Sequence, residues 1–137
     1  MPEEEKAEIQ SQHKMLNSSS GFSFCYQERL HLNRDFRNIM RYGRKIPTKF
    51  STIIVLNRKD DNTIRRLGLV TSGKVGTAAE RNRAKRRLRE IFRTHKHKLT
   101  PGLDIIFILK PEIKLTGYST IEQTVLNCLK NAGFYSE

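Results

Sequence analysis

The chain has 137 residues, of which 36% are hydrophobic, and this length suits one domain with a single core. Its formal net charge is +12, and residues 29–98 hold 21 of the 26 basic residues against 5 acidic ones. A positive charge this concentrated predicts a polyanionic partner. No run of about 20 apolar residues is present, which excludes a membrane-spanning segment.

The first 28 residues are acidic and polar, with three glutamates at residues 3–5 and a Ser-Ser-Ser-Gly stretch at residues 18–21. Such a composition buries too little apolar surface to repay ordering, so we expect a mobile tail over residues 1–28 and one α/β domain over residues 29–137. The tail lacks the basic and apolar pattern of a secretory signal. The two cysteines match neither a disulfide framework nor a zinc site, and together these features predict a cytoplasmic protein.

The first predicted helix begins at Asn33, an N-cap residue, carries Phe36, Ile39 and Met40 at helical spacing and ends at Gly43. Two β-rich runs follow at residues 50–56 and 67–70, and the polar turn between them suggests an antiparallel pair. Thr77-Ala78-Ala79-Glu80 has the pattern of a capping box and predicts that a central helix begins there.

Residues 103–109 form a nearly continuous apolar run after Pro101-Gly102, which predicts a strand covered on both faces. Ser119-Thr120-Ile121-Glu122 has the pattern of a second capping box, and an apolar stripe from Ile121 to Ala132 predicts a last helix that stops at Gly133. The predicted order is therefore α-β-β-α-β-α, an α+β fold of sandwich type with a mixed sheet.

The central helix is the candidate functional element. Ten basic residues between Lys74 and Lys98 face only two acidic ones, Glu80 and Glu90. Such self-repulsion within a folded domain costs stability unless a polyanion neutralises it, so nucleic-acid binding outweighs a merely solvated face. One helix face is predicted to pack, through Ala84, Leu88, Ile91, Phe92 and His95, and the opposite face is lined by Asn82, Arg86, Arg89 and Arg93.

Catalysis by the polypeptide is not expected. The acidic residues are scattered, no two histidines have a spacing suited to acid–base work, and no metal-ligand cluster is visible. Asp60-Asp61 is more typical of a solvated turn than of a site. The aromatic residues Phe36, Tyr42 and Phe50 suit either a core or a base-stacking surface, and burial statistics favour the core.

Residues 68–92, GLVTSGKVGTAAERNRAKRRLREIF, resemble the signature of the protein subunit of bacterial ribonuclease P. The resemblance rests on Ser72, Lys74, Val75-Gly76, the Arg81-Asn82-Arg83 triplet and the run Lys85-Arg86 to Arg89-Glu90. Asp35-Phe36, Gly43, Arg66, Gly102, Asp104 and Lys110-Pro111 add further matches. Met40 stands where the family often has Phe, and Arg87 where it usually has an apolar residue.

The resemblance implies a left-handed βαβ crossover through the basic helix, against the general right-handed rule. It implies that a catalytic RNA with bound Mg²⁺, and no organic cofactor, cleaves the 5′ leader from precursor tRNA, while the protein supplies no catalytic residue and no metal site. The partners would be the RNA subunit and precursor tRNA, with no membrane. The RNA-binding residues would be Lys74, Arg81, Asn82, Arg83, Lys85, Arg86, Arg89 and Arg93, and the leader cleft would be formed by Phe36, Met40, Phe50 and Arg66.

Two other function classes remain open at this point. A ribosomal or other structural RNA-binding protein shares the basic helix without any processing role, and only the ordered motif around Asn82 separates the two. A metal-dependent protein nuclease would cleave without added RNA.

Overall fold

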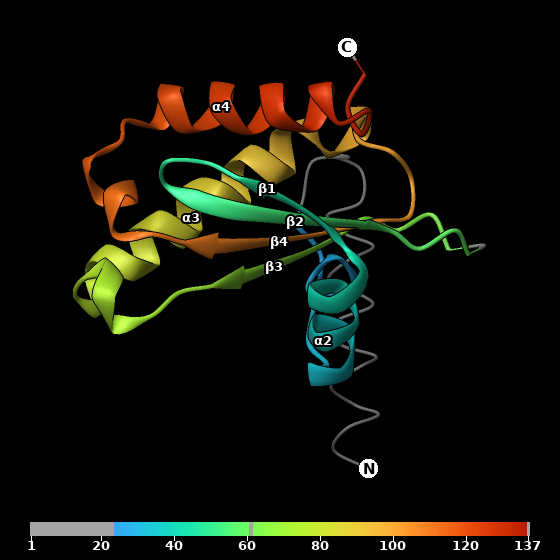
Figure 1. Cartoon of the computed structure of the whole chain (residues 1–137), viewed down its shortest axis with the longest axis horizontal. Helices are drawn as coiled ribbons and strands as arrows, with labels where there is room; N and C mark the ends of the chain where they lie inside the picture. The colour runs from blue at the N-terminus through green and yellow to red at the C-terminus, as the bar shows by residue number, and fades with distance from the viewer. Residues whose placement is uncertain (1–23, 61, 137) are drawn as a thin grey trace.

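The computed structural model describes residues 24–60 and 62–136. It has a four-stranded mixed sheet and helices on both of its faces, which confirms the predicted α+β class (Figure 1). The strands are β1 (Arg44–Pro47), β2 (Ser51–Asn57), β3 (Arg66–Val70) and β4 (Leu103–Leu109), and the longer helices are α2 (Asn33–Tyr42), α3 (Ala78–His95) and α4 (Tyr118–Asn131).

The strand order is β1-β2-β4-β3, with β4 antiparallel to β2 and parallel to β3. The predicted antiparallel pair of residues 50–56 and 67–70 is therefore wrong, because β4 lies between these strands. β4 is the strand most deeply buried on both faces, as its apolar sequence predicts, and such a strand occupies the centre of a sheet. The connection from β2 to β3 crosses the end of β4, where the Gly102 amide donates to the Thr63 carbonyl at 3.1 Å.

The chain passes from β3 to the parallel strand β4 through α3. In Figure 1 both strands point to the left, β4 lies above β3 and α3 runs behind the sheet, so this crossover is left-handed, as the resemblance implies. The edge strand β1 is short and mostly exposed and was not predicted from the sequence. Its charged residues suit an edge, since they discourage pairing with another chain.

The two faces of the sheet carry separate apolar clusters. The larger cluster joins alternate residues of β2 and β4, such as Ile53 and Ile105, to α3 and α4. The smaller cluster, on the opposite face, joins Ile54 and Ile106 to Ile39 of α2. In Figure 1 α2 lies on one side of the sheet and α4 on the other. This division decides which side chains can meet.

The helix ends agree only in part with the sequence patterns. Gly43 follows α2 as predicted, but its φ of −72° is ordinary, and glycine suits it because a Cβ would lie 2.5 Å from the Ile39 carbonyl oxygen. The predicted second capping box is wrong: α4 begins at Tyr118 without a side-chain cap, and Glu122 instead lies 3.1 Å from Nε2 of His95. Gly133, with φ of 86°, follows the end of α4 as predicted.

Residues 24–28, which the composition assigned to the tail, pack on the domain. Phe24 contacts the Phe92 ring edge-on at 5.5 Å between centroids, and the short 3-10 turn η1 (Tyr26–Glu28) brings Glu28 within 2.9 Å of the Lys96 ammonium. The remainder of the predicted mobile tail lies outside the described residues. Within residues 24–60 and 62–136, none of the helices has the length and apolar character that crossing a bilayer requires.

Candidate nucleic-acid interface

The capping box at the start of α3 is confirmed. The Glu80 amide donates to Oγ1 of Thr77 at 3.2 Å, and the Thr77 amide donates to Oε1 of Glu80 at 3.0 Å. The hydrogen bond from the Thr77 backbone lowers the pKa of Glu80, and Lys114 lowers it further. Gly76, with φ of 143°, is required here because a Cβ would lie 2.6 Å from the Glu80 carboxylate. The basic helix therefore has a fixed start.

The two faces of α3 are those that the sequence predicts. Ala84, Leu88, Ile91 and Phe92 are buried in the larger core cluster, and His95 is half-buried beside Glu122. On the other side the polar residues reach solvent. The residues predicted to bind RNA fall into two groups. Four are exposed, namely Lys74, Asn82, Arg83 and Arg86, and four are half-buried, namely Arg81, Lys85, Arg89 and Arg93. Lys74 lies in the short turn η2 (Gly73–Val75), just before the helix.

Arg93 differs from the other predicted RNA-binding residues because its charge is compensated. Its Nε and Nη2 atoms donate to the two carboxylate oxygens of Glu90, at 3.1 and 2.5 Å. This hydrogen bonding raises the pKa of Arg93 and lowers that of Glu90. The pair occupies two of the five guanidinium N–H donors and offsets the positive charge that Arg93 would present to a phosphate. Arg93 is thus the least available member of the set.

Arg87 points away from the polar face. Its Nη1 atom donates to the Thr116 carbonyl at 3.1 Å, in the connection that precedes α4, and the side chain is half-buried. Its neighbour Arg86 is exposed on the polar face. The resemblance puts an apolar residue at position 87, and the structure explains why a charged one fits: the guanidinium reaches a carbonyl oxygen across the surface of the core.

Arg29 joins this surface, and the sequence analysis did not identify it. Burial, together with the charges of Arg29 and Arg86, lowers the pKa of Arg89, so the Arg89 guanidinium is repelled by one arginine of its own helix and by one from the preceding segment. Two contacts hold Arg29 in place. Its guanidinium lies over the Phe24 ring, with Cζ 4.7 Å from the ring centroid, and its backbone forms a parallel bridge with Leu67. Only the apolar neighbours Phe24 and Leu30 could have signalled that this segment is ordered.

The four residues predicted to form the leader cleft do not all lie on one face. Phe36 packs on the sheet in the smaller cluster. Gly68 leaves space for its ring, because a Cβ at Gly68 would lie 2.7 Å from the Phe36 ring. Met40 is exposed on the same helix. Phe50 is buried in the larger cluster, on the side of the sheet that faces α3 and α4. Its assignment to a common layer with Phe36 and Met40 is wrong: Phe50 precedes β2 and does not follow the alternation of that strand, which turns Ile54 toward α2.

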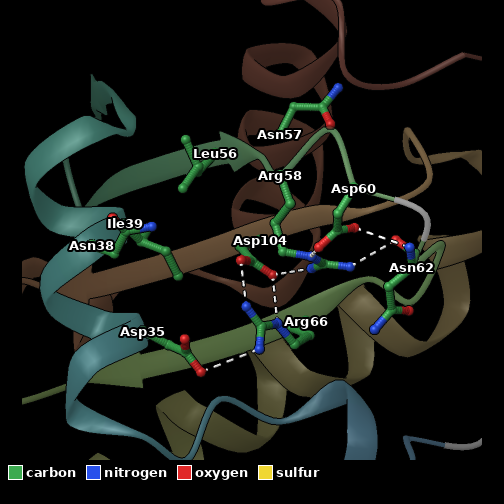
Figure 2. A pocket seen from close by; sticks show the side chains of 10 residues that line it. All are labelled: Asp35, Asn38, Ile39, Leu56, Asn57, Arg58, Asp60, Asn62, Arg66 and Asp104. Carbon is green, nitrogen blue, oxygen red and sulfur yellow. Dashed lines mark hydrogen bonds and ion pairs between the residues drawn. The ribbon is translucent and has the colours of Figure 1, made fainter.

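Arg66 lies on the α2 side of the sheet, within a network of ion pairs around the buried Asp104 (Figure 2). Nε and Nη2 of Arg66 each donate to one oxygen of Asp104 at 2.8 Å, and Nη1 donates to Asp35 of α2 at 3.2 Å. Arg58 also binds Asp104. The hydrogen bonds that Arg66 donates to Asp104 raise the pKa of Arg66, and this guanidinium fixes α2 against the sheet rather than standing free in a cleft.

Comparison with known proteins agrees with this arrangement. The ribonuclease P family profile matches residues 24–133. The chain is 38% identical over 112 residues to the "Ribonuclease P protein component" of Thermotoga maritima, which covers 79% of this chain and 94% of that protein. It is 34% identical over 97 residues to the protein of the same name from Clostridioides difficile, which covers 70% of this chain and 83% of that protein.

Solved structures agree with the sequence relatives. The ribonuclease P protein of Staphylococcus aureus superposes with a TM-score of 0.70 at 31% identity and covers 80% of this chain and 98% of its own. The Thermotoga maritima protein gives a TM-score of 0.66 at 33% identity and covers 76% of this chain and 96% of its own. With a matching profile over most of its length, relatives above 30% identity and a shared fold, the chain belongs to the ribonuclease P protein family.

Proposed function

We propose that this chain is the protein component of a bacterial ribonuclease P, which assists a catalytic RNA in removing the 5′ leader from precursor tRNA. The observation that carries this proposal is the polar face of α3. There Asn82, Arg83 and Arg86 stand exposed on a capped helix, in a chain of this family. Within the described residues, no carboxylate forms an ion pair with these two arginines.

The RNA subunit is the partner proposed for this face. Guanidinium groups spaced one helical turn apart match phosphates along an RNA backbone, and the Asn82 amide adds a directional donor and acceptor. The repulsion of Arg89 by Arg29 and by Arg86 supports this assignment, because a phosphate bound beside Arg89 relieves it. Arg29 is thereby added to the predicted set, and Arg93 is expected to contribute least.

Precursor tRNA is the substrate proposed for the opposite side of the sheet. Phe36 of α2 packs against the smaller apolar cluster and Met40 is exposed on the same helix, where an unpaired leader could cover both. Arg66 supports this side indirectly, because it holds α2 in position through Asp35. Phe50 has no part in this proposal.

The chemistry is assigned to the RNA subunit, with Mg²⁺ bound mainly through RNA and no organic cofactor. Residues 24–60 and 62–136 contain no group of three His, Cys, Asp or Glu side chains that could hold a metal ion, so the described residues do not fit a metal site of their own. The protein's role is then to bind and orient RNA, and we propose that it works in the cytoplasm, where tRNA is made.

The proposal for α3 is tested by comparing two adjacent arginines. Arg86→Ala removes a solvent-facing charge and is expected to weaken binding to the ribonuclease P RNA and to lower the salt slope by about one unit, since one phosphate contact is lost. Arg87→Ala removes the same charge from the side that contacts Thr116, and is expected to lower the melting temperature with little change in the slope. Unchanged affinity and slope in Arg86→Ala combined with Arg89→Ala would contradict the assignment.

Assignment of the chemistry is tested by incubating the pure protein with precursor tRNA and Mg²⁺, with and without the RNA subunit. Leader removal is expected only when the RNA subunit is present. No single Asp or Glu to Ala change in residues 24–136 should stop cleavage beyond its effect on folding or assembly. Cleavage by the protein alone, or one carboxylate essential in a fully assembled complex, would overturn the proposal.

A further inference from the structure

The outward face of α2 carries a second group of basic residues, on the opposite side of the sheet from α3. Arg34, Arg37 and Arg41 recur at spacings of three and four residues, so they share one stripe of the helix, away from Phe36 and Ile39. All three are exposed. A shallow groove along this stripe is lined by Arg34, Asp35, Arg37, Asn38, Arg41 and Tyr42.

The charge of this stripe is not balanced. Within the described ranges, none of the three arginines forms an ion pair with a carboxylate. Asp35, the one acidic residue that lines the groove, is directed to Arg66 at 3.2 Å and so serves the network around Asp104. Three like charges at one-turn spacing destabilise an isolated helix slightly, and an anion along the stripe removes that repulsion.

The aromatic residue at the end of the groove indicates what kind of anion fits. Tyr42 is 63% exposed, and the Arg41 guanidinium lies over its ring with Cζ 5.3 Å from the centroid. Bases in a duplex are stacked on one another and cannot use an exposed ring, whereas unpaired bases stack on aromatic and guanidinium planes. Asn38, between Arg34 and Tyr42 on the same stripe, offers hydrogen bonds to such a base.

We infer that the groove formed by Arg34, Arg37, Asn38, Arg41 and Tyr42 binds single-stranded RNA. The identity of the occupant rests on the proposed function: it is the part of the precursor tRNA leader that extends beyond Phe36 and Met40. Met40 lies between Phe36 and Arg37 around the helix, so a strand leaving the apolar cluster passes directly onto the stripe. The protein then holds RNA on both sides of its sheet, the RNA subunit against α3 and the leader against α2.

The first experiment uses the full-length protein and a labelled single-stranded oligoribonucleotide, with a duplex of the same length for comparison. In the variant Arg34→Ala/Arg37→Ala/Arg41→Ala, single-strand affinity is expected to fall about tenfold or more, and the salt slope by about two units, at about 0.7 per phosphate lost. The variant should fold, because alanine has the highest helix propensity. Circular dichroism and the melting temperature check this.

The matched control removes three exposed lysines elsewhere, in Lys59→Ala/Lys114→Ala/Lys130→Ala. An equal loss of affinity and slope in the two triple variants would overturn the inference, because the effect would then follow net charge alone. A larger loss for the duplex than for the single strand would also overturn it. Tyr42→Ala should weaken single-strand binding about fivefold and Tyr42→Phe should retain wild-type affinity, since stacking needs only the ring. Equal effects of both changes would count against the groove.

The second experiment uses the complex assembled with the ribonuclease P RNA and two precursor tRNAs. One has a leader too short to pass Met40, and the other has a leader extended by further unpaired nucleotides. The triple arginine variant should lose affinity for the long leader and keep wild-type affinity for the short one. Equal affinities of the variant and the wild type for the long leader would refute the leader assignment. Failure of the wild-type complex to cleave either precursor would instead refute the proposed function, while the free-protein experiment still tests the groove.

Discussion

Asp104 is 1% exposed, and its carboxylate is shared by two arginines from different segments. Arg58 follows β2 and also donates to the carbonyls of Asn62 and Ile64, while Arg66 begins β3 and reaches Asp35 of α2. Figure 2 shows Arg58 and Arg66 converging on this carboxylate, while Asp35 is linked to it through Arg66. A single side chain therefore joins the β2–β3 connection, the central strand and α2, which is the helix that carries both proposed leader contacts.

Replacing Asp104 by Asn should destabilise the domain strongly. The change leaves Arg58 and Arg66 without their shared counter-charge in a half-buried setting, and removing one partner of a buried ion pair costs about 3–5 kcal/mol. Asn keeps one acceptor oxygen, so we expect a value near 3 kcal/mol in urea unfolding. Asp60→Asn is the control, because Asp60 is 50% exposed in its pair with Arg58 and should cost less than about 1 kcal/mol. Similar losses in both variants would contradict this role of Asp104.

Residues on the polar face of α3 could be predicted from spacing alone, because a helix converts sequence position directly into direction. The exceptions are residues whose partners come from elsewhere in the chain. Arg87 is directed by Thr116 and Arg66 by Asp104, and both partners lie more than 25 residues away in sequence. Arg29 lacks any local pattern and acquires its role only because the fold brings Arg89 beside it.

At the scale of elements, two stretches with the same capping-box pattern behave differently. Thr77 and Glu80 form the box, whereas Ser119 and Glu122 do not. Gly76 immediately before Thr77 gives the backbone a conformation that leaves room for the Glu80 carboxylate. Glu122 instead meets His95 across the contact of α3 with α4. A local signal thus holds only where no tertiary contact competes for the same side chain.

The capping box predicts a pH dependence of stability. The folded protein lowers the pKa of Glu80 below its ordinary value of 4.5, chiefly through the Thr77 backbone hydrogen bond. The ionised form therefore adds stability that is fully present above pH 4.5 and is lost as the pH falls through the lowered value in the folded state. Glu80→Gln keeps an acceptor oxygen but not the charge. We expect its melting temperature to lie below that of the wild type at neutral pH and to approach it on acidification.

A control for this prediction is Thr77→Ala, which removes the hydroxyl acceptor at every pH and should cost about 1 kcal/mol throughout. A constant difference between Glu80→Gln and the wild type across the acid range would show that the charge of Glu80 contributes nothing beyond the hydrogen bond.

At the scale of the whole molecule, the sheet separates two tasks. The face toward α3 and α4 holds the main core, and the face toward α2 is only partly covered. The sequence predicted β2, β3 and β4 but neither the edge strand β1 nor the strand order, since pairing β3 with β4 depends on a crossover of more than thirty residues that no local pattern specifies. The error at Phe50 has a different cause: Phe50 lies just before β2 and joins the main core, whereas the alternation of the strand would turn it toward α2 together with Ile54.

Phe50 and Met40 provide a test of this separation. Phe50 is 2% exposed in the main core, so Phe50→Ala should cost about 3–5 kcal/mol and affect every RNA ligand alike. Met40 is 36% exposed on α2, so Met40→Phe overfills no cavity and enlarges the surface available to an unpaired base. Its affinity for precursor tRNA should rise by up to about 1 kcal/mol, the low end of the stacking range, with no change for mature tRNA, which has no leader.

The test measures the affinity of both variants for precursor and mature tRNA, together with their melting temperatures. It separates the two faces of the sheet because each variant alters a different face. If Met40→Phe instead lowers stability and shifts both tRNAs equally, Met40 belongs to the packed interior and the leader does not cross α2. If Phe50→Ala keeps the stability of the wild type and loses affinity for precursor tRNA only, the two faces of the sheet have been assigned the wrong way round. Only a selective gain at Met40 beside a general loss at Phe50 fits a sheet with one closed face and one face open to substrate.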